Sequence, residues 1–500
     1  MRHIFVTILV ALSSFAHAAV DTRLLNQLAA EDSDEKIIAI QKIAQSAEPD
    51  AKSILQSLAD GNLNDPDGQP ITINNRVRRE IDGALAVLKL FDPSAVVRLN
   101  SVKEISTNAD ASMAPMLRKA IAQESDVKVK ALLVEVYALA TLKDPDKDIR
   151  LAAVTALATS ADPNNKSVLF EMSKPENEAE TAVRMAAFRS YLQVKQRQTV
   201  VENVGRVFSG LSLASILLLA AMGLAITYGV MGVINMAHGE LLMIGAYATF
   251  GVQSIFRTFF PAQLDWYVPV AIPVAFLAAA AVGVVLERTV IRWLYGRPLE
   301  TLLATWGLSL ILIQAARLIF GAQNVELANP SWMTGGVEVM PGIVLPLNRI
   351  FIIGFSLFVL TLVWVLMNKT RLGMFVRAVT QNRGMAGCVG VPTARIDTVA
   401  FALGAGIAGL GGVALSQIAN VGPDMGQGYI VDSFMVVVLG GVGQLAGAVW
   451  AALGLGVATK FIEAGAGAVV AKILVLVFII IFIQKRPQGL FALKGRFVES

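Results

Sequence analysis

The chain is poor in the residues that carry most enzyme chemistry. Of its 500 residues, one is cysteine and three are histidine. Because Cys388 is alone, no disulfide can form within the chain, and a metal site built from several cysteines is impossible. No catalytic nucleophile, no metal-ligating cluster and no pair of catalytic carboxylates stands out in the sequence. We therefore expect no catalytic residue, no metal and no cofactor in this chain.

Charged residues are scarce as well, and their distribution divides the chain. They make up 16% of it, against 55% hydrophobic residues, and the mean hydropathy is +0.60. Residues 20–200 have a soluble composition, whereas 208–484 consist mostly of apolar runs. This favours two domains with a boundary near residue 200. The net charge of +4 is modest, and the basic residues of the apolar half lie in loops, so we expect no nucleic-acid partner.

Residues 1–18 predict a secretory signal peptide. MRHIFVTILVALSSFAHA has a basic start, a short apolar core and an A-x-A site at Ala16–Ala18. The alternative is an uncleaved anchor. In either case the domain that follows, residues 19–204, is expected to be exported to the periplasm.

An internal repeat indicates that the exported domain is helical. Phe91-Asp92-Pro93 followed by Val97-Arg98-Leu99 returns as Lys143-Asp144-Pro145 followed by Ile149-Arg150-Leu151, an offset of 144 − 92 = 52. Apolar residues between these segments follow a helical period. The pattern resembles HEAT-type α-solenoids, although the spacing matches a helical-repeat class rather than one named family. The exported domain could dock a partner protein or could be only a structural cap, and the sequence leaves both roles open.

Residues 205–500 predict an all-α polytopic membrane domain of about eight or nine spans. Apolar runs of roughly the 20 residues that cross a bilayer occur throughout this half. They lie at 208–230, 239–257, 268–290, 301–320, 350–367, 396–418, 432–459 and 468–484. Basic residues gather in the loops at 288–297 and 369–395 and in the tail, which should be cytoplasmic. Eight passes would put the tail outside, so either the seventh run is two passes or one run is re-entrant. We favour a ninth, discontinuous crossing near Leu439–Leu445.

The first two runs meet at a glycine-rich break that carries polar residues. Gly229, Gly232 and Gly239 interrupt the stretch, and Asn235, His238 and Glu240 stand at the interruption. Polar groups at membrane depth are costly and persist where they face a protein interior or a water-filled path. The break therefore indicates either a transporter core or a short loop at the bilayer surface.

Two nucleotide-binding motifs can be set aside. GAGIAG at 404–409 matches G-x-G-x-x-G but lies inside an apolar run, so it indicates close helix packing rather than dinucleotide binding. The pattern G-x-x-x-x-G-K-[ST] does not occur, so ATP binding through such a loop is not expected.

Several blocks resemble the permease subunits of branched-chain amino acid ABC importers, in order over essentially all of 205–495. They are GLAITYGVMGVINMAHGELLMIGAYATF (223–250), RPLETLLATWGLSLIL (297–312), TRLGMFVRAVTQN (370–382), FALGAGIAGLGGVAL (401–415), VVVLGGVGQLAGAVWAALGLG (436–456) and RPQGLF (486–491). The long exported extension resembles the urea-transporter branch of that family.

The resemblance implies a non-enzymatic transport subunit of the bacterial inner membrane. Its partners would be a second permease subunit, two cytoplasmic ATPases and a periplasmic solute-binding protein. The basic loop 368–395 would be the segment that couples to an ATPase, and the alternative is a loop that only sets topology. The residues expected to touch the ATPase are Arg377, Asn382, Arg383 and Gly390.

A small polar solute needs hydrogen-bonding groups along its path but no counter-charge. The candidates at membrane depth are Thr227, Asn235, His238, Glu240, Gln314, Gln417, Asn420, Asp432 and Gln444. For each of them a structural role at an interface or helix end is the alternative. Urea is the first candidate solute, and branched-chain amino acids or short amides are the alternatives. An ATP-independent channel or secondary transporter is the competing class.

Overall fold

The computed structural model describes residues 24, 27–30, 32–46, 50–64, 71–107, 109–160, 162–340 and 343–491. The expected signal peptide at 1–18 lies outside the described residues. The chain divides into two compact units, residues 1–199 and 200–500.

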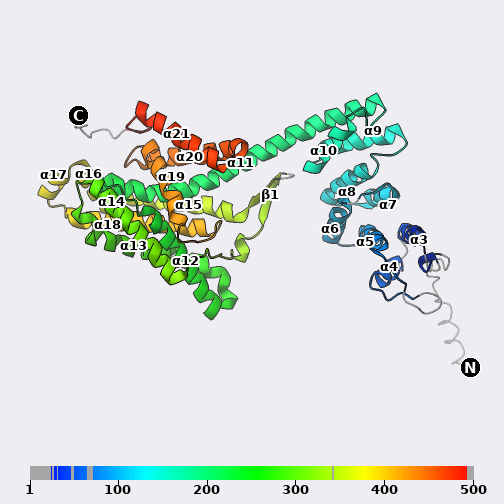
Figure 1. Ribbon diagram of the computed structural model, residues 1–500, viewed down its shortest axis with the longest axis horizontal. Coiled ribbons are helices and arrows are strands. Elements are labelled where there is room, and N and C mark those ends of the chain that lie inside the picture. The colour runs from blue at the N-terminus through cyan, green and yellow to red at the C-terminus, as the bar shows by residue number, and fades with distance from the viewer. Residues whose placement is uncertain are drawn as a thin grey trace, which may run out of the picture. The chain divides into compact units, whose positions relative to one another are not determined.

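The first unit is a succession of short helices (Figure 1). They are α3 (Ser33–Ser46), α4 (Ala51–Ala59), α5 (Asn75–Lys89), α6 (Ala95–Ser106), η1 (Ala111–Met113), α7 (Ala114–Gln123), α8 (Val127–Ala140), α9 (Lys147–Ala156), η2 (Leu157–Thr159) and α10 (Pro163–Met172). One Asp-Pro pair begins a helix: Asp162 accepts a hydrogen bond from the Asn164 amide at 2.9 Å, and Pro163 takes the first helical position of α10. At the other two pairs Asp92 and Asp144 accept from the Ser94 and Asp146 amides, in the turns before α6 and α9.

The sequence repeat corresponds to a repeated arginine environment. Arg98 donates through Nε and Nη2 to the Glu124 carboxylate at 2.7 and 2.8 Å, and through Nη1 to the Asp92 carbonyl at 2.8 Å. Arg150 donates in the same way to the Glu178 carboxylate at 2.8 and 2.9 Å and to the Asp144 carbonyl at 2.8 Å. The offset of 52 residues therefore marks two copies of one structural motif, in which an arginine ties the Asp-Pro turn before its own helix to a glutamate further along the chain.

The second unit contains long helices and one small antiparallel hairpin. Its helices are α11 (Thr181–Met231, which begins in the first unit), α12 (His238–Phe259), η3 (Pro261–Trp266), α13 (Tyr267–Thr289), η4 (Ile291–Trp293), α14 (Pro298–Phe320), η5 (Ser331–Met333), α15 (Leu347–Lys369), α16 (Arg371–Gln381), α17 (Arg383–Cys388), α18 (Thr393–Ser416), α19 (Met425–Gly440), α20 (Leu445–Ala466) and α21 (Ala468–Lys485). The hairpin pairs β1 (Gly336–Met340) with β2 (Ile343–Pro346).

Seven helices in the described part of the chain are long and apolar enough to cross a membrane. They are α11, α13 with its flanking 3-10 turns, α14, α15, α18, α20 and α21. The number is lower than the eight or nine expected for two reasons. Helix α12 is long enough but not apolar enough, and α19 has only 16 residues. The seventh apolar run is broken as expected: α19 ends and α20 begins around Gly441 and Gly443, whose φ angles are +100° and +75°. That α19 and α20 each cross the bilayer remains a prediction.

Helices α11, α12 and α18 form the interior of the second unit, and glycine allows their close approach. A Cβ on Gly412 of α18 would lie 2.0 Å from the Leu242 carbonyl oxygen of α12, and one on Gly245 would lie 2.1 Å from the Gly409 carbonyl. The stretch 404–409 is buried inside α18, which confirms a packing role.

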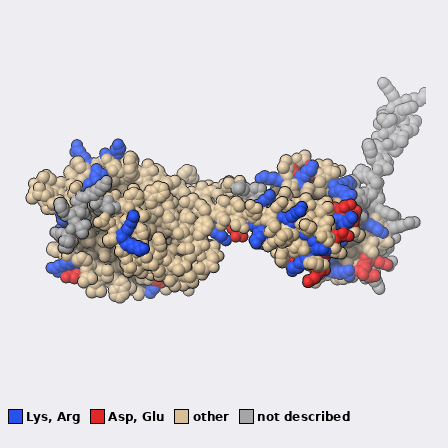
Figure 2. Space-filling model, turned by 90° about the horizontal axis from the view of Figure 1, so that it is seen from above, with Lys and Arg blue, Asp and Glu red and all other residues tan. Residues whose placement is uncertain are grey.

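The outer helices α13, α14, α15, α20 and α21 are buried over at most a third of their apolar windows. They expose large apolar side chains such as Leu299, Leu318 and Trp450. Figure 2 shows few charged side chains on the visible face of this unit, whereas the first unit carries many of both signs. An apolar exterior of this kind suits the hydrocarbon core of a bilayer.

Candidate functional site

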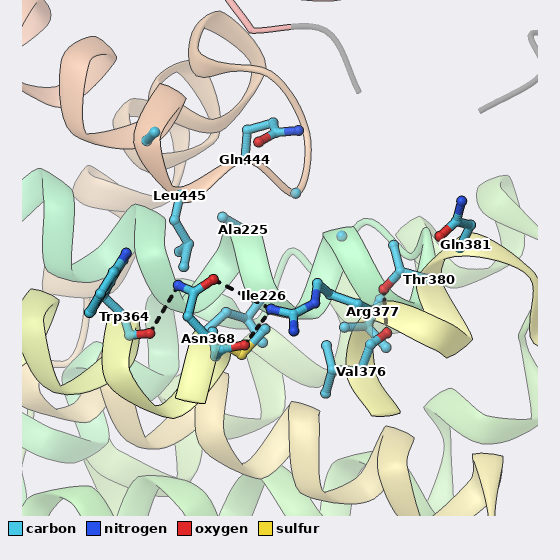
Figure 3. A pocket seen from close by; sticks show the side chains of 15 residues that line it. Ala225, Ile226, Trp364, Asn368, Val376, Arg377, Thr380, Gln381, Gln444 and Leu445 are labelled. Carbon is cyan, nitrogen blue, oxygen red and sulfur yellow. Dashed lines mark hydrogen bonds between the residues drawn. The ribbon is translucent and has the colours of Figure 1, made fainter. Parts of the chain in front are cut away.

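A cavity of about 430 Å³ opens where four segments of the second unit meet. The ends of α11 and α15, one face of α16 and the turn between α19 and α20 line it (Figure 3). Its apolar wall includes Ile226, Val230, Trp364 and Leu445. Its polar side chains are Asn368, Arg377, Thr380, Gln381 and Gln444. The cavity thus brings Arg377, an expected coupling residue, together with Gln444, an expected path residue.

Arg377 holds α16 against the end of α15. Its Nη1 donates to the Met367 carbonyl at 2.6 Å and to Asn368 Oδ1 at 3.4 Å. Asn368 in turn donates through Nδ2 to the Trp364 carbonyl at 3.0 Å. Figure 3 shows Gln444 and Leu445 entering from the α19–α20 turn, opposite Asn368 and Arg377. The arginine therefore serves the fold with one nitrogen and faces the cavity with the rest of its guanidinium group.

The other expected coupling residues also make contacts within the chain. Asn382 caps α17 by accepting from the Met385 amide at 2.9 Å. Arg383 pairs with the buried carboxylate of Asp397 on α18. Gly390 has a φ of +85°, which an L side chain rarely adopts.

Large apolar side chains also lie on the outer surface of this segment, beside its exposed basic residues. Met385 is 60% exposed and Val389 is 74% exposed, although both side chains are large and hydrophobic. The sequence analysis names Arg377, Asn382, Arg383 and Gly390 in this loop but neither Met385 nor Val389. Apolar residues in an otherwise basic loop were the signal that could have found them. A surface of this kind fits contact with another protein better than contact with water.

A buried polar network lies beneath α17 and was not anticipated. Tyr295 donates to Glu287 Oε1 at 3.0 Å, and Thr398 donates to Glu287 Oε2 at 2.7 Å. The guanidinium of Arg383 lies 5.0 Å from the centre of the Tyr295 ring. Burial, and then the nearby Asp397 and Glu287 carboxylates, raise the pKa of Tyr295, so its hydroxyl stays protonated as a donor. The network connects α13, α17 and α18.

Four of the expected path residues lie near the break between α11 and α12. Asn235, His238 and Glu240 are at most 2% exposed, and Thr227 is 1% exposed. His238 donates through Nε2 to the Ala220 carbonyl of α11 at 2.9 Å, and the Ser309 hydroxyl lies against Glu240. The break is therefore buried within the protein, and its depth in the bilayer remains a prediction.

Some polar atoms at this break have no hydrogen-bond partner in the described part of the chain: Asn235 Nδ2, His238 Nδ1 and Glu240 Oε2. Thr227, by contrast, bonds to the Gly223 and Leu224 carbonyls of its own helix, and its methyl group packs against Gly404. Asn235 also lines a cavity of about 290 Å³ that is otherwise apolar and lies between α19 and α21.

The remaining path candidates are dispersed. Gln314 and Asn420 are exposed. Gln417 is buried, with its Oε1 3.1 Å from the Tyr267 hydroxyl. Asp432 lies 3.5 Å from Lys472. Of the nine candidates, only Gln444 lines the cavity that contains Arg377. The nine residues do not form one continuous lining, and which of them meet a solute remains a prediction.

The described helices define a polytopic membrane protein with a glycine-packed interior and a cavity at the ends of its helices. Residues 206–483 match the family described as "Branched-chain amino acid transport system / permease component". Because the match covers more than half of the chain, the protein belongs to this family, whose members are transport subunits.

Characterised relatives agree with this assignment. The chain is 29% identical over 291 residues to the high-affinity branched-chain amino acid transport system permease protein LivH of Salmonella typhimurium, covering 57% of this chain and 94% of the relative. LivH of Escherichia coli K12 gives the same identity and coverage, and BraD of Pseudomonas aeruginosa is 28% identical with the same coverage. No solved structure matches the chain.

Proposed function

We propose that this chain is one permease subunit of an ATP-driven importer in a bacterial inner membrane. The observation that carries the proposal is the family match over the whole membrane unit. It is supported by the exposed apolar pair Met385 and Val389, which offers a docking surface for a partner. A second permease subunit, two cytoplasmic ATPases and a periplasmic solute-binding protein complete the importer.

The orientation rests on charge. Basic residues at 288–297, at 369–395 and in the C-terminal segment favour a cytoplasmic position for α16, α17 and the cavity lined by Arg377. The first unit then lies in the periplasm, where the solute-binding protein would meet the permease. In this arrangement α17 contacts an ATPase through Met385 and Val389, while Arg383 connects α17 to the transmembrane helix α18 through Asp397.

Two solute classes compete. The names of the relatives favour branched-chain amino acids. The long extension before the first membrane helix favours urea, because it resembles the urea branch of the family. In either case the solute would cross the interior that holds the polar residues of the α11–α12 break.

Uptake of labelled leucine and labelled urea tests the proposal, in cells with the chain, without it, and with the partner ATPase inactivated. We expect uptake of one solute to require both the chain and the active ATPase. Uptake that needs the chain but survives loss of the ATPase would contradict the proposal and favour a channel.

The docking surface has its own test. We expect Met385→Asp with Val389→Asp to abolish co-purification of the ATPase, because each carboxylate would have to be desolvated against an apolar partner surface. The matched control is Val96→Asp with Val127→Asp, two exposed apolar residues of the first unit, outside the coupling segment and the candidate membrane helices. Retention of the ATPase by the Met385/Val389 variant would show that the partner docks elsewhere.

A further inference from the structure

The arginine motif of the first unit occurs a third time, at the start of α11. Arg184 is the fourth residue of its helix, as Arg98 is in α6 and Arg150 is in α9. Its Nη1 donates to the carbonyls of Glu178 and Ala179, six and five positions earlier, at 2.9 and 2.6 Å. In the two earlier copies Nη1 donates to the carbonyls at the same two offsets, at 2.8 and 3.0 Å. The three arginines therefore hold the same kind of turn.

The third copy has no carboxylate for its arginine. In the first two copies Nε and Nη2 bind Glu124 and Glu178, which come 26 and 28 residues after the arginine. In the third copy Nη2 donates to the Thr181 hydroxyl of the same helix at 2.9 Å, and the Nε of the half-buried Arg184 has no hydrogen-bond partner among the described residues. The corresponding positions, 210–212, lie inside α11 itself, so the chain places no turn there.

Apolar positions that are buried in the earlier copies are exposed in the third. The residue four positions after the arginine is Val102 in α6 and Val154 in α9, each 0% exposed, whereas the matching Phe188 of α11 is 47% exposed. Met185 is 54% and Leu192 is 45% exposed, and helical spacing puts both on the same face as Phe188. Helices α7 and α10 follow α6 and α9 and share hydrophobic clusters with them, but in the described chain α11 runs on with no short helix after it.

The charge around this face has one sign. Residues 181–199 contain four basic residues and no acidic one. Arg184 lies one helical turn before Phe188, and Lys195 lies one turn after Leu192. An element that covered the face would therefore need apolar side chains toward α11 and carboxylates at its rim.

We propose that this exposed face of α11 docks an acidic amphipathic helix of another protein. The partner helix takes the place that α7 and α10 have in the earlier copies, with its apolar side on Met185, Phe188 and Leu192. A carboxylate of the partner takes the place of the two glutamates and accepts from the Nε of Arg184. A helical repeat does not bury its apolar face alone, and terminal repeats usually end in a polar outer face. Here the terminal repeat ends in an apolar face, and the partner completes it.

A basic, apolar helix face also suits a bilayer surface. The two earlier copies favour a protein helix, because in them the same edge of the arginine binds a carboxylate and the same apolar positions pack against helices. The inference does not depend on the proposed transport function, since it rests on contacts within the first unit. It gives the first unit a binding role beyond that of a structural cap.

Photo-crosslinking in intact cells tests the proposal, with the full chain carrying p-benzoylphenylalanine in place of Phe188. We expect an adduct with one other protein, whose crosslinked peptide, identified by mass spectrometry, forms an amphipathic helix that contains Asp or Glu. The same photoreactive residue in place of Val127, an exposed apolar position of α8, is the control and should give no such adduct.

Variants made with the probe at position 188 separate docking from folding. Met185→Glu with Leu192→Glu should lower the adduct yield by about 10-fold or more, because the carboxylates would be desolvated against the partner. The thermal unfolding midpoint should not change, since both side chains are exposed. Arg184→Gln should lower the yield by a similar factor, as expected for loss of a hydrogen bond to a charged group. Lys103→Gln, at an exposed position of α6, is its control.

Charge reversal tests the pairing itself. Arg184→Glu should abolish the adduct, and changing the partner's carboxylate nearest the crosslink to arginine should restore it. Four results would overturn the inference: no protein adduct at position 188, an adduct with lipid only, an adduct between two copies of this chain, or an undiminished yield in Met185→Glu with Leu192→Glu.

Discussion

Arginine side chains show how differently one residue type serves the two units. In the first unit Arg98 and Arg150 are nearly buried and satisfied by a glutamate and a backbone carbonyl. In the second unit Arg377 is exposed at the rim of a cavity, and its Nη1 donates to Met367 and Asn368. The first kind of arginine stabilises a fold, since a bidentate carboxylate pair fixes two segments relative to each other. The second kind joins α16 to the end of α15 while the rest of its guanidinium group stays exposed.

At this scale we predict that Arg150→Ala destabilises the first unit by about 2–3 kcal/mol, because it leaves the Glu178 carboxylate buried without its charged partner. Thermal unfolding of the purified chain measures the effect. Arg189→Ala, at an exposed position of α11, is the control and should change the midpoint little.

The Arg150–Glu178 ion pair also makes the stability of the first unit depend on pH. Arg150 lowers the pKa of Glu178, so the carboxylate is more acidic in the folded chain than in the unfolded one. The stability that it contributes is present above the usual glutamate pKa of about 4.3 and is lost as the pH falls through the lowered value. A first unit whose stability did not decline in this acidic range, or declined equally in Arg150→Ala, would contradict the assignment.

At the scale of helices, the interior of the second unit depends on the absence of side chains. Gly245 and Gly412 bring the backbones of α12 and α18 into contact. Packing of this kind replaces the hydrophobic driving force, which does not act between helices in lipid. The result is a rigid centre beside the α11–α12 break and its unpartnered polar atoms.

We predict that Gly412→Leu prevents correct assembly of the second unit, because even a Cβ would lie 2.0 Å from a backbone oxygen of α12. The cost exceeds the about 1–3 kcal/mol typical of overpacking, since backbone rather than a flexible side chain must move. Size-exclusion profiles of detergent-solubilised protein report it. Gly251→Ala, where a Cβ meets nothing within 4 Å, should give the wild-type profile. Two identical profiles would mean that α12 and α18 do not meet at Gly412.

At the scale of the whole molecule, each unit has its own hydrophobic clusters. Those of the first unit draw on residues between Leu24 and Val194, and those of the second on residues between Leu213 and Ile483. An independent core is what allows a unit to fold alone.

We therefore predict that deleting residues 24–180 leaves the second unit folded and able to co-purify with its partner ATPase. The thermal unfolding midpoint of the membrane unit, compared with that of the full chain, measures this. Aggregation of the shortened chain would contradict it. If the shortened chain folds but loses uptake, the first unit has a docking role; if uptake is retained, it is a structural cap.

The amino-acid sequence by itself determined the helical class, the soluble and apolar halves, the break near Leu439–Leu445, the arginine repeat and the family. These features depend on local hydropathy, periodicity and spacing, which neighbouring residues set. Only the tertiary structure decided which polar residues meet. Gln444 lies opposite Arg377, and His238 bonds to Ala220, because helices distant in sequence pack there. It also decided that Asn382 and Arg383, although exposed, bond within their own chain, and that the apolar side chains of Met385 and Val389 are exposed as well. Hydropathy indicates that a residue is polar, but its partner depends on how the helices pack.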